Sequence, residues 1–264
     1  MRVFVEGVGL LGPGLNGWQA SRVLLAGDAD HIDMPTVVTV DESLPAAERR
    51  RIGLPVKLAL AAGRAAFADA QRDAATTATV FTSSAGDGDN IHHICSTLAS
   101  PQRDISPTRF HNSVHNAAAG YWSIATRSHA QSTSLCCYDA SFAAGLLDAA
   151  AQIEVDAQPV ALIAYDQPYP HPLHAVRAIG ASFGMALVLT PHATARACAS
   201  LEVNFMPGAA RATRMADRGL EAMRASVPAA RSLPLLCALA RGTTEVVILE
   251  YLADSHLHVR VAPC

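Results

Sequence analysis

The chain has 264 residues, half of them hydrophobic and only 16% charged, which is enough apolar material to bury a large core. We therefore expect one compact unit or two closely fused halves, and not a disordered chain. The formal net charge is -3 and the basic residues are scattered, so no strong positive field favours nucleic acid or an anionic membrane surface.

The positions of the charged residues and of the cysteines indicate in which cellular compartment the protein works. Glu6 stands inside what would be the apolar core of a signal peptide, and no later stretch is long and apolar enough to span a bilayer, so we expect a cytoplasmic protein without a membrane span. The six cysteines include no Cys-x-x-Cys pair. Because the vicinal pair Cys136 and Cys137 has poor geometry for a disulfide, we expect reduced thiols.

In chain order, the first elements alternate between strand and helix. Residues 2–7 form a β-branched run that ends in glycine, and residues 18–26 have helical spacing that stops at Gly27. Apolar residues recur at helical intervals over 54–70, and residues 78–82 resemble a buried strand followed by a turn. This order is typical of an α/β protein.

The alternation continues through the middle of the chain. Residues 112–126 have a helical pattern, 132–137 form a short strand, 141–155 a second helix, and 159–164 an apolar strand of the kind buried on both faces of a sheet. Strands separated by helices of this length predict parallel pairing with right-handed crossovers.

A stretch rich in proline and histidine, 167–174, marks the expected boundary between two halves. Beyond it the patterns predict strands at 184–189 and 199–204, a helix at 214–225, and a closing hairpin from 245–251 and 256–261. We therefore expect a first half over 1–166 and a shortened second half over 167–264, packed as one structural unit.

The run from Gly7 to Gly12 fits the dinucleotide-binding pattern G-x-G-x-x-G and follows a predicted strand. In such a motif the third glycine opens a helix that holds the pyrophosphate, but Pro13 and Gly14 instead predict a turn that delays any helix. We favour a glycine-rich turn after the first strand and expect no cofactor.

Histidines suggest a metal site, because His111 and His115 are four residues apart and His92-His93 precedes Cys95. No third ligand falls at a helical interval beside His111 and His115, and such pairs are common without metal. We therefore expect surface or capping histidines and no metal.

Cys136 and Cys137 stand at a predicted strand end just before a helix. A thiol at a helix N-terminus could be a nucleophile, because the helix dipole stabilises its thiolate. The alternative is that both are small apolar strand residues on opposite faces of the sheet. The choice depends on which residue occupies the turn.

Several segments together resemble the β-ketoacyl synthase family. Residues 106–110 (SPTRF), 116–120 (NAAAG) and 132–135 (STSL) are similar to the family's run before its active-site elbow, 143–164 to the helix and strand after it, and 3–12 and 183–189 to the opening strands of its two halves. The resemblance implies a thiolase-like fold with a nearly complete N-terminal half and a truncated C-terminal half.

In the same register, Asp139 stands where the family has its nucleophilic cysteine, and Cys136 and Cys137 fall on the preceding strand. The two glycine-rich turns that hold the family's catalytic histidines are not visible downstream. Because the condensation needs a thiolate and histidine donors for the enolate, the resemblance implies no independent condensing activity and no catalytic residue.

The resemblance also implies a partner. Family members are dimers in which the strand before the elbow pairs across the interface, here Ser134, Leu135, Cys136 and Cys137. A short member without catalytic residues is similar to chain length factors of aryl polyene and xanthomonadin-type pathways. We expect a heterodimer in which an active β-ketoacyl synthase binds the acyl carrier protein and this chain shapes the acyl tunnel.

The resemblance also suggests gate residues, meaning side chains that close the end of the acyl tunnel. In the family, such side chains project toward the tunnel of the partner subunit. These positions match Arg109, Phe110 and His111, and we take Arg109, Phe110 and Trp122 as tunnel candidates because bulky rings stop a growing chain by excluded volume. Ordinary interface packing is the equal alternative for Phe110 and Trp122.

Two other functions stay open. One is an enzyme, either an acyltransferase that uses Cys136 or Cys137 or a malonyl-carrier decarboxylase that works through the altered elbow. The other is a ligand-binding homodimer that needs no partner.

Overall fold

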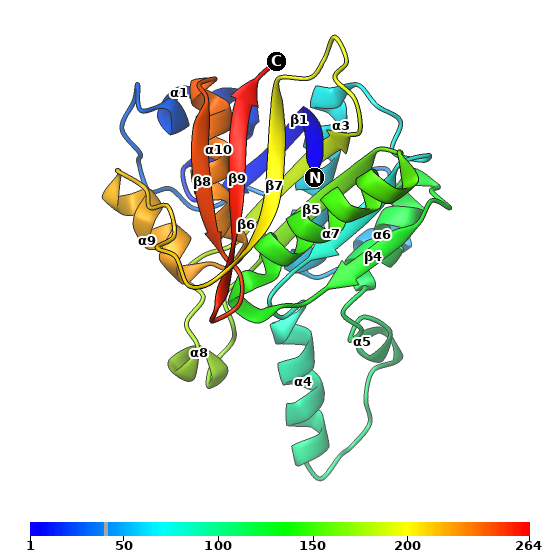
Figure 1. Cartoon of the computed structure of the whole chain (residues 1–264). Helices are drawn as coiled ribbons and strands as arrows, with labels where there is room; N and C mark the ends of the chain where they lie inside the picture. Colours follow the sequence, from blue (N-terminus) through cyan, green and yellow to red (C-terminus); the bar gives the residue numbers. More distant parts are fainter. Residues whose placement is uncertain (40–41) are drawn as a thin grey trace.

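The computed structural model describes residues 1–39 and 42–264, and the strands of these residues form one mixed sheet (Figure 1). The strands are β1 (Arg2–Gly12), β2 (Leu15–Asn16), β3 (Ala78–Thr82), β4 (Ser132–Leu135), β5 (Val160–Asp166), β6 (Phe183–Thr190), β7 (Ala199–Pro207), β8 (Glu245–Glu250) and β9 (Ser255–Pro263). Within the described ranges their order across the sheet is β4-β3-β5-β6-β1-β7-β9-β8, with β2 paired to β1.

Helices cover both faces of this sheet. They are α1 (Trp18–Ala26), α2 (Ala46–Arg49), α3 (Leu54–Ala70), α4 (Gly88–Ala99), α5 (Pro107–His111), α6 (Ala117–Thr126), α7 (Ser141–Asp156), α8 (Leu173–Val176), α9 (Arg218–Ser226) and α10 (Leu233–Arg241), with 3-10 turns η1 (Tyr138–Ala140) and η2 (Ala229–Ser232). Among the described residues, no helix has the length and apolar character needed to cross a bilayer.

Two apolar cores follow from the alternation of side chains along the strands. On β5, Leu162 and Ala164 join a core with α7 and α10, whereas Ile163 and Tyr165 join a second core with α3 and α6. The apolar run predicted at 159–164 is therefore buried on both faces of the sheet, as its sequence predicted.

The parallel pairing predicted for the alternating strands of the first half is confirmed for β3, which runs parallel to β4 and to β5, but not for β1, whose partners β6 and β7 run antiparallel to it. The closing hairpin predicted near the C-terminus is confirmed as β8 and β9. The pairs β5–β6, β6–β1, β1–β7, β7–β9 and β9–β8 are antiparallel. Helices α4 to α6 and α7 form the parallel crossovers, but the β5–β6 connection contains only the four-residue α8, so the chain returns antiparallel. As a result β6 lies between β5 and β1.

The glycine pattern near the N-terminus serves packing within the sheet. Gly7 and Gly9 lie inside β1 and not in a turn, because the strand continues to Gly12. A Cβ atom on Gly9 would overlap the carbonyl oxygen of Ala62, and one on Gly7 would overlap that of Ala66, so glycine lets α3 approach β1 closely. The expected glycine-rich turn after residue 7 is thus wrong, and this strand geometry gives no pyrophosphate loop.

The carboxyl ends of the parallel strands β3, β4 and β5 meet at one edge of the sheet, where α/β proteins commonly place a functional site. Helices α4 and α5 project beyond this edge, away from the end where the C-terminus lies (Figure 1). The residues that follow β3, β4 and β5 therefore converge beside these two helices.

Candidate functional site

The turn between β4 and α7 occupies the centre of this edge. Strand β4 ends at Leu135, so Cys136 and Cys137 lie beyond it, and our placement of both cysteines on the strand is wrong. The Ser141 hydroxyl accepts a hydrogen bond from the Cys137 amide at 3.1 Å and donates one to the Tyr138 carbonyl at 2.7 Å. The first residue of α7 thus closes the turn.

Tyr138 is the strained residue of the turn. Its φ angle is 53°, in the left-handed region that bulky residues rarely adopt, and its side chain is largely exposed. The guanidinium carbon of Arg177 lies 3.4 Å from the centroid of the Tyr138 ring, a cation–π contact that holds the ring in place. Such strain persists only where its surroundings fix it.

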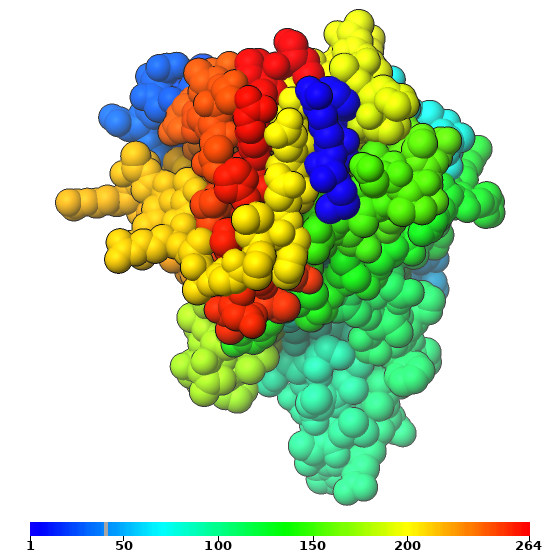
Figure 2. Space-filling view, in the orientation of Figure 1, coloured from blue at the N-terminus to red at the C-terminus, as the bar shows by residue number. Residues whose placement is uncertain are grey.

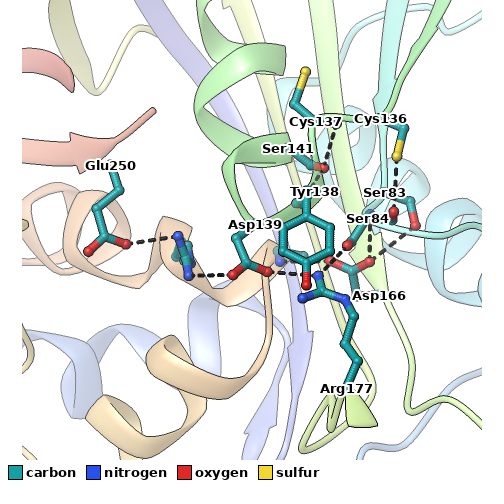
Figure 3. Close-up of polar contacts among 12 residues, drawn as sticks. Ser83, Ser84, Cys136, Cys137, Tyr138, Asp139, Ser141, Asp166, Arg177 and Glu250 are labelled. Atoms are coloured by element: carbon teal, nitrogen blue, oxygen red, sulfur yellow. Dashed lines mark hydrogen bonds and ion pairs between the residues drawn. The ribbon is translucent and has the colours of Figure 1, made fainter. Parts of the chain in front are cut away.

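Asp139 follows Tyr138 and is bound by two arginines (Figure 3). Its Oδ1 atom accepts from Arg177 Nη2 at 2.7 Å, and its Oδ2 atom accepts from Arg231 Nη2 at 3.1 Å. Arg231 also forms an ion pair with Glu250 at 2.8 Å. Two carboxylates and two guanidiniums therefore alternate, and both oxygens of Asp139 are engaged.

A buried carboxyl group, Asp166 at the end of β5, lies behind this ion-pair network. It accepts hydrogen bonds from the Ser84 amide at 2.8 Å, the Ala229 amide at 2.8 Å and the Ser83 hydroxyl at 3.1 Å. Burial raises the pKa of Asp166 to about 7, against the lowering effect of these hydrogen bonds. Arg177 connects the two parts, because its Nη2 atom also donates to the Ser84 hydroxyl at 2.8 Å.

Neither thiol of the turn has the environment of an activated nucleophile. Cys136 Sγ donates to the Ser84 carbonyl at 2.9 Å, as Figure 3 shows. Burial raises the pKa of the Cys137 thiol, and the neighbouring Cys136 raises it further. Reactive cysteines have a lowered pKa, so the turn does not favour a Cys137 thiolate.

Histidines do not assemble a metal centre here. His115 Nε2 lies 3.2 Å from the carbonyl oxygen of Ser83, at the border of the site, whereas the hydrogen bonds to the Asp139 carboxylate within residues 1–39 and 42–264 come from Arg177 and Arg231. In the part of the chain that the structure describes, no three histidine, cysteine or carboxylate side chains lie close enough to hold a metal ion.

The tunnel candidates have different environments. Phe110 on α5 is 68% exposed. Arg109 lines a polar cleft of about 570 Å³ between α4 and α5, together with Asp87, Asn90 and Asn112. Trp122 is 1% exposed and packs against Phe67 and Phe81 in the core beneath α6, so it cannot reach a partner's tunnel and its assignment as a gate is wrong.

Sequence patterns did not reveal three residues of the site. No local sequence pattern points to Tyr138 as a site residue. Arg177 and Arg231 lie 38 and 92 residues from Asp139 in the chain. Ser141 was the one detectable signal, since a serine between a strand and a helix can bind backbone groups of the turn with its hydroxyl.

Comparisons with known proteins agree with this architecture. A profile of the family described as "Beta-ketoacyl synthase, N-terminal domain" matches residues 18–251. No curated protein matches the chain.

Solved structures with similar folds come from ketosynthase systems. A chain of the "Ketosynthase (ApeO) in Complex with its Chain Length Factor (ApeC) from Xenorhabdus doucetiae" has a TM-score of 0.75 at 21% identity, covering 98% of this chain and 99% of that chain. A chain of "The ishigamide ketosynthase/chain length factor" has a TM-score of 0.74 at 16% identity, covering 100% and 99%. A β-ketoacyl synthase from Burkholderia phymatum STM815 has a TM-score of 0.63 at 17% identity, covering 87% and 70%. At these identities the likeness shows the fold, and the predicted thiolase-like fold is confirmed.

Proposed function

Because this chain belongs to the β-ketoacyl synthase family, we propose that it is a non-catalytic subunit of the chain length factor type. It pairs with an active β-ketoacyl synthase in the cytoplasm and shapes the tunnel for the growing acyl chain of a polyketide such as an aryl polyene. The acyl carrier protein delivers its substrate to the partner. The observation that carries this proposal is the double arginine pairing of Asp139 in the turn between β4 and α7.

The chemistry of condensation supports a silent role. The reaction needs a nucleophile that accepts the acyl group and donors that stabilise the developing enolate. Asp139 offers no thiol, and a substrate would have to displace Arg177 or Arg231 to reach its oxygens. Cys137 does not replace the missing nucleophile, because its pKa is raised.

The position of β4 supports pairing with a second subunit. This strand is the last in the sheet, and its outer edge has no strand partner within residues 1–39 and 42–264. An unpaired edge is a template for pairing with another chain. We propose that Ser134 and Leu135 pair across the interface and that Cys136 and Cys137 border it. The similar chains from the ApeO–ApeC and ishigamide complexes are consistent with this arrangement.

With Trp122 buried in the core, the remaining candidates for shaping the acyl tunnel are Arg109 and Phe110 on α5. Phe110 is exposed on a helix that projects from the body, so its ring is available to a partner. We propose that Phe110 limits the length of the acyl chain and that Arg109 positions α5, since the Arg109 carbonyl accepts a hydrogen bond from Asn90 at 2.8 Å.

We also propose that residues 1–166 correspond to the nearly complete first half of the fold and residues 167–264 to a shortened second half. The continuous sheet supports their packing as one unit, with β6 completing the sheet of the first half.

Co-expression with a candidate ketosynthase, followed by size-exclusion chromatography with mass detection, tests the pairing. We expect a one-to-one complex that Ser134→Arg weakens, because the substitution places a large cation at the free edge of β4. Val155→Arg, on the exposed surface of α7, is the matched control and should leave the complex intact. A stable homodimer that ignores the ketosynthase would contradict the proposal.

Mass spectrometry of the isolated chain after incubation with acyl thioesters tests the silent role. We expect no acyl adduct and no condensation product, and we expect Asp139→Cys to restore no condensation because, among the described residues, the donors on Asp139 are arginines and not histidines. An adduct on Cys136 or Cys137 of the unaltered chain would instead establish an acyltransferase.

A further inference from the structure

Two cysteines far apart in the sequence face each other at the end of the sheet that carries the chain terminus. Cys198 directly precedes β7 and Cys264 directly follows β9. The antiparallel register pairs Ala199 with Pro263, which places Cys198 opposite Cys264. The Cys264 amide donates to the Cys198 carbonyl at 3.4 Å, so the ladder continues through this pair.

The two side chains point to the same face of the sheet, because directly opposed residues in an antiparallel pair always do. Glu202 and Arg260 are also directly opposed and lie four residues from Cys198 and Cys264, on the same face of the sheet. Their side chains form an ion pair at 3.5 Å. Figure 2 shows β7 in yellow and β9 in red side by side at the surface of the molecule. Both Cys198 and Cys264 are exposed there.

From this register we propose that Cys198 and Cys264 form a reversible cross-strand disulfide. Directly opposed residues in an antiparallel pair have Cα atoms about 4.5–5.5 Å apart. That separation lies inside the range of about 4.4–6.8 Å that disulfides span. The vicinal pair Cys136 and Cys137 has no comparable geometry, so the bond is specific to this end of the sheet.

A low-molecular-weight disulfide such as oxidised glutathione supplies the oxidising equivalents. The Cys264 thiolate attacks one sulfur of the oxidant, which releases one reduced thiol and leaves a mixed disulfide on Cys264. The Cys198 thiolate then attacks the Cys264 sulfur of that mixed disulfide and releases the second reduced thiol. Two protein thiols become one disulfide, the oxidant gains the two electrons, and the two protons are taken up by the released thiols.

The surroundings of the two cysteines make this bond sensitive to the redox state and to the pH of the solution. An exposed disulfide is readily reduced, so the pair remains dithiol in a reducing compartment and closes under oxidation. Desolvation by neighbouring side chains raises the pKa of the Cys198 thiol, and the nearby charges of Asp69 and Cys264 raise it further. The second step therefore accelerates as the pH rises.

The bond joins the start of β7 to the end of β9, and it restricts the unfolded chain by closing a long loop. It lies at the end of the molecule that carries the C-terminus, opposite α4 and α5 (Figure 1). Oxidation should therefore change the stability of the fold without changing assembly with a ketosynthase, which separates this inference from the proposed function.

Peptide mapping after equilibration in glutathione buffers of increasing oxidation tests the proposal. Trypsin releases Cys198 on peptide 197–211 and Cys264 on peptide 261–264, and each peptide carries one cysteine. We expect these two peptides to appear covalently joined and two hydrogens lighter than their sum, and to separate after reduction. Oxidation should also raise the melting temperature by on the order of 5 °C.

Cys198→Ser and Cys264→Ser should each abolish both the joined peptide and the thermal shift. Cys95→Ser, a substitution of an exposed cysteine on α4, is the matched control and should leave both unchanged. Separate glutathione adducts on Cys198 and Cys264, or a disulfide that joins either of them to another cysteine, would overturn the proposal.

Discussion

Arg177 holds Tyr138 by stacking on its ring, with the guanidinium carbon 3.4 Å from the ring centroid. The same guanidinium donates to Asp139 and to the Ser84 hydroxyl. One side chain from the β5–β6 connection thus fixes Tyr138 and Asp139 and ties them to Ser84, just after the end of β3.

Replacing Arg177 should loosen this turn. Arg177→Ala removes two hydrogen bonds, one of them charge-assisted to Asp139, and a cation–π contact, so we expect a loss of about 1–3 kcal/mol in the free energy of unfolding, measured with urea. We also expect faster reaction of Cys136 with thiol reagents, because its acceptor on Ser84 loses its support.

Arg241→Ala is the matched control for that experiment. Arg241 forms an ion pair with Glu245 at 3.0 Å, but both side chains are substantially exposed, so we expect a loss of only about 0.5 kcal/mol. Equal losses for the two variants would show that the network around Asp139 is no more than a surface ion pair.

Asp166 should make the fold less stable as the pH rises from about 4 to about 7. Its folded pKa of about 7 lies above the unfolded value, so the folded state keeps a proton that the unfolded state has already released. Linkage then lowers the free energy of unfolding by roughly 1.4 kcal/mol for each pH unit in this window, and the contribution is lost fully above the folded pKa.

Urea unfolding at pH 5 and pH 7, with wild type and Asp166→Asn side by side, measures this effect. The variant should be less stable at pH 5, because its amide group cannot accept all of the hydrogen bonds from Ser83, Ser84 and Ala229. It should also lose less stability between the two pH values than wild type does. The same pH dependence in both proteins would rule out Asp166 as its source.

Trp122 should behave as a core residue. Its ring centroid lies 5.4 Å from that of Phe67 and 6.2 Å from that of Phe81, and we expect Trp122→Ala to cost about 3–5 kcal/mol. Trp122→Phe should cost less, because it also removes a buried indole N–H that finds no acceptor among the described residues. Denaturant unfolding checks both values, and a near-neutral Trp122→Ala would place the ring at a surface instead.

The sequence was informative where long apolar patterns dominate. The periodic runs at α3 and α7 and the apolar run at β5 were recognisable because burial alone determines them. Helix α4 was missed although its apolar residues Ile91, Ile94, Cys95 and Leu98 recur at helical intervals and Asp87 caps it by accepting from the Asn90 amide. Helix α10 was missed because it is apolar on nearly every side, which leaves no periodicity to detect.

The candidate site was predictable only in part. The family register placed Asp139 between a strand and a helix, and the structure has it in that turn. Its arginine partners come from distant segments that the fold brings together, and no local pattern connects them. Strand β6 runs antiparallel to β5 because the connection between them contains no full crossover helix, and the sequence pattern did not reveal this direction.

Phe110 should affect the product and not the fold. Its side chain is 68% exposed, so Phe110→Ala should change the free energy of unfolding by less than about 0.5 kcal/mol. In the reconstituted pair with a ketosynthase, the smaller side chain removes the steric stop, and we expect longer polyene products by mass spectrometry. Val114→Ala, at a second exposed apolar position near α5, is the matched control and should leave product length unchanged. If Phe110→Ala also yields products of wild-type length, its ring packs at the interface and the tunnel ends elsewhere.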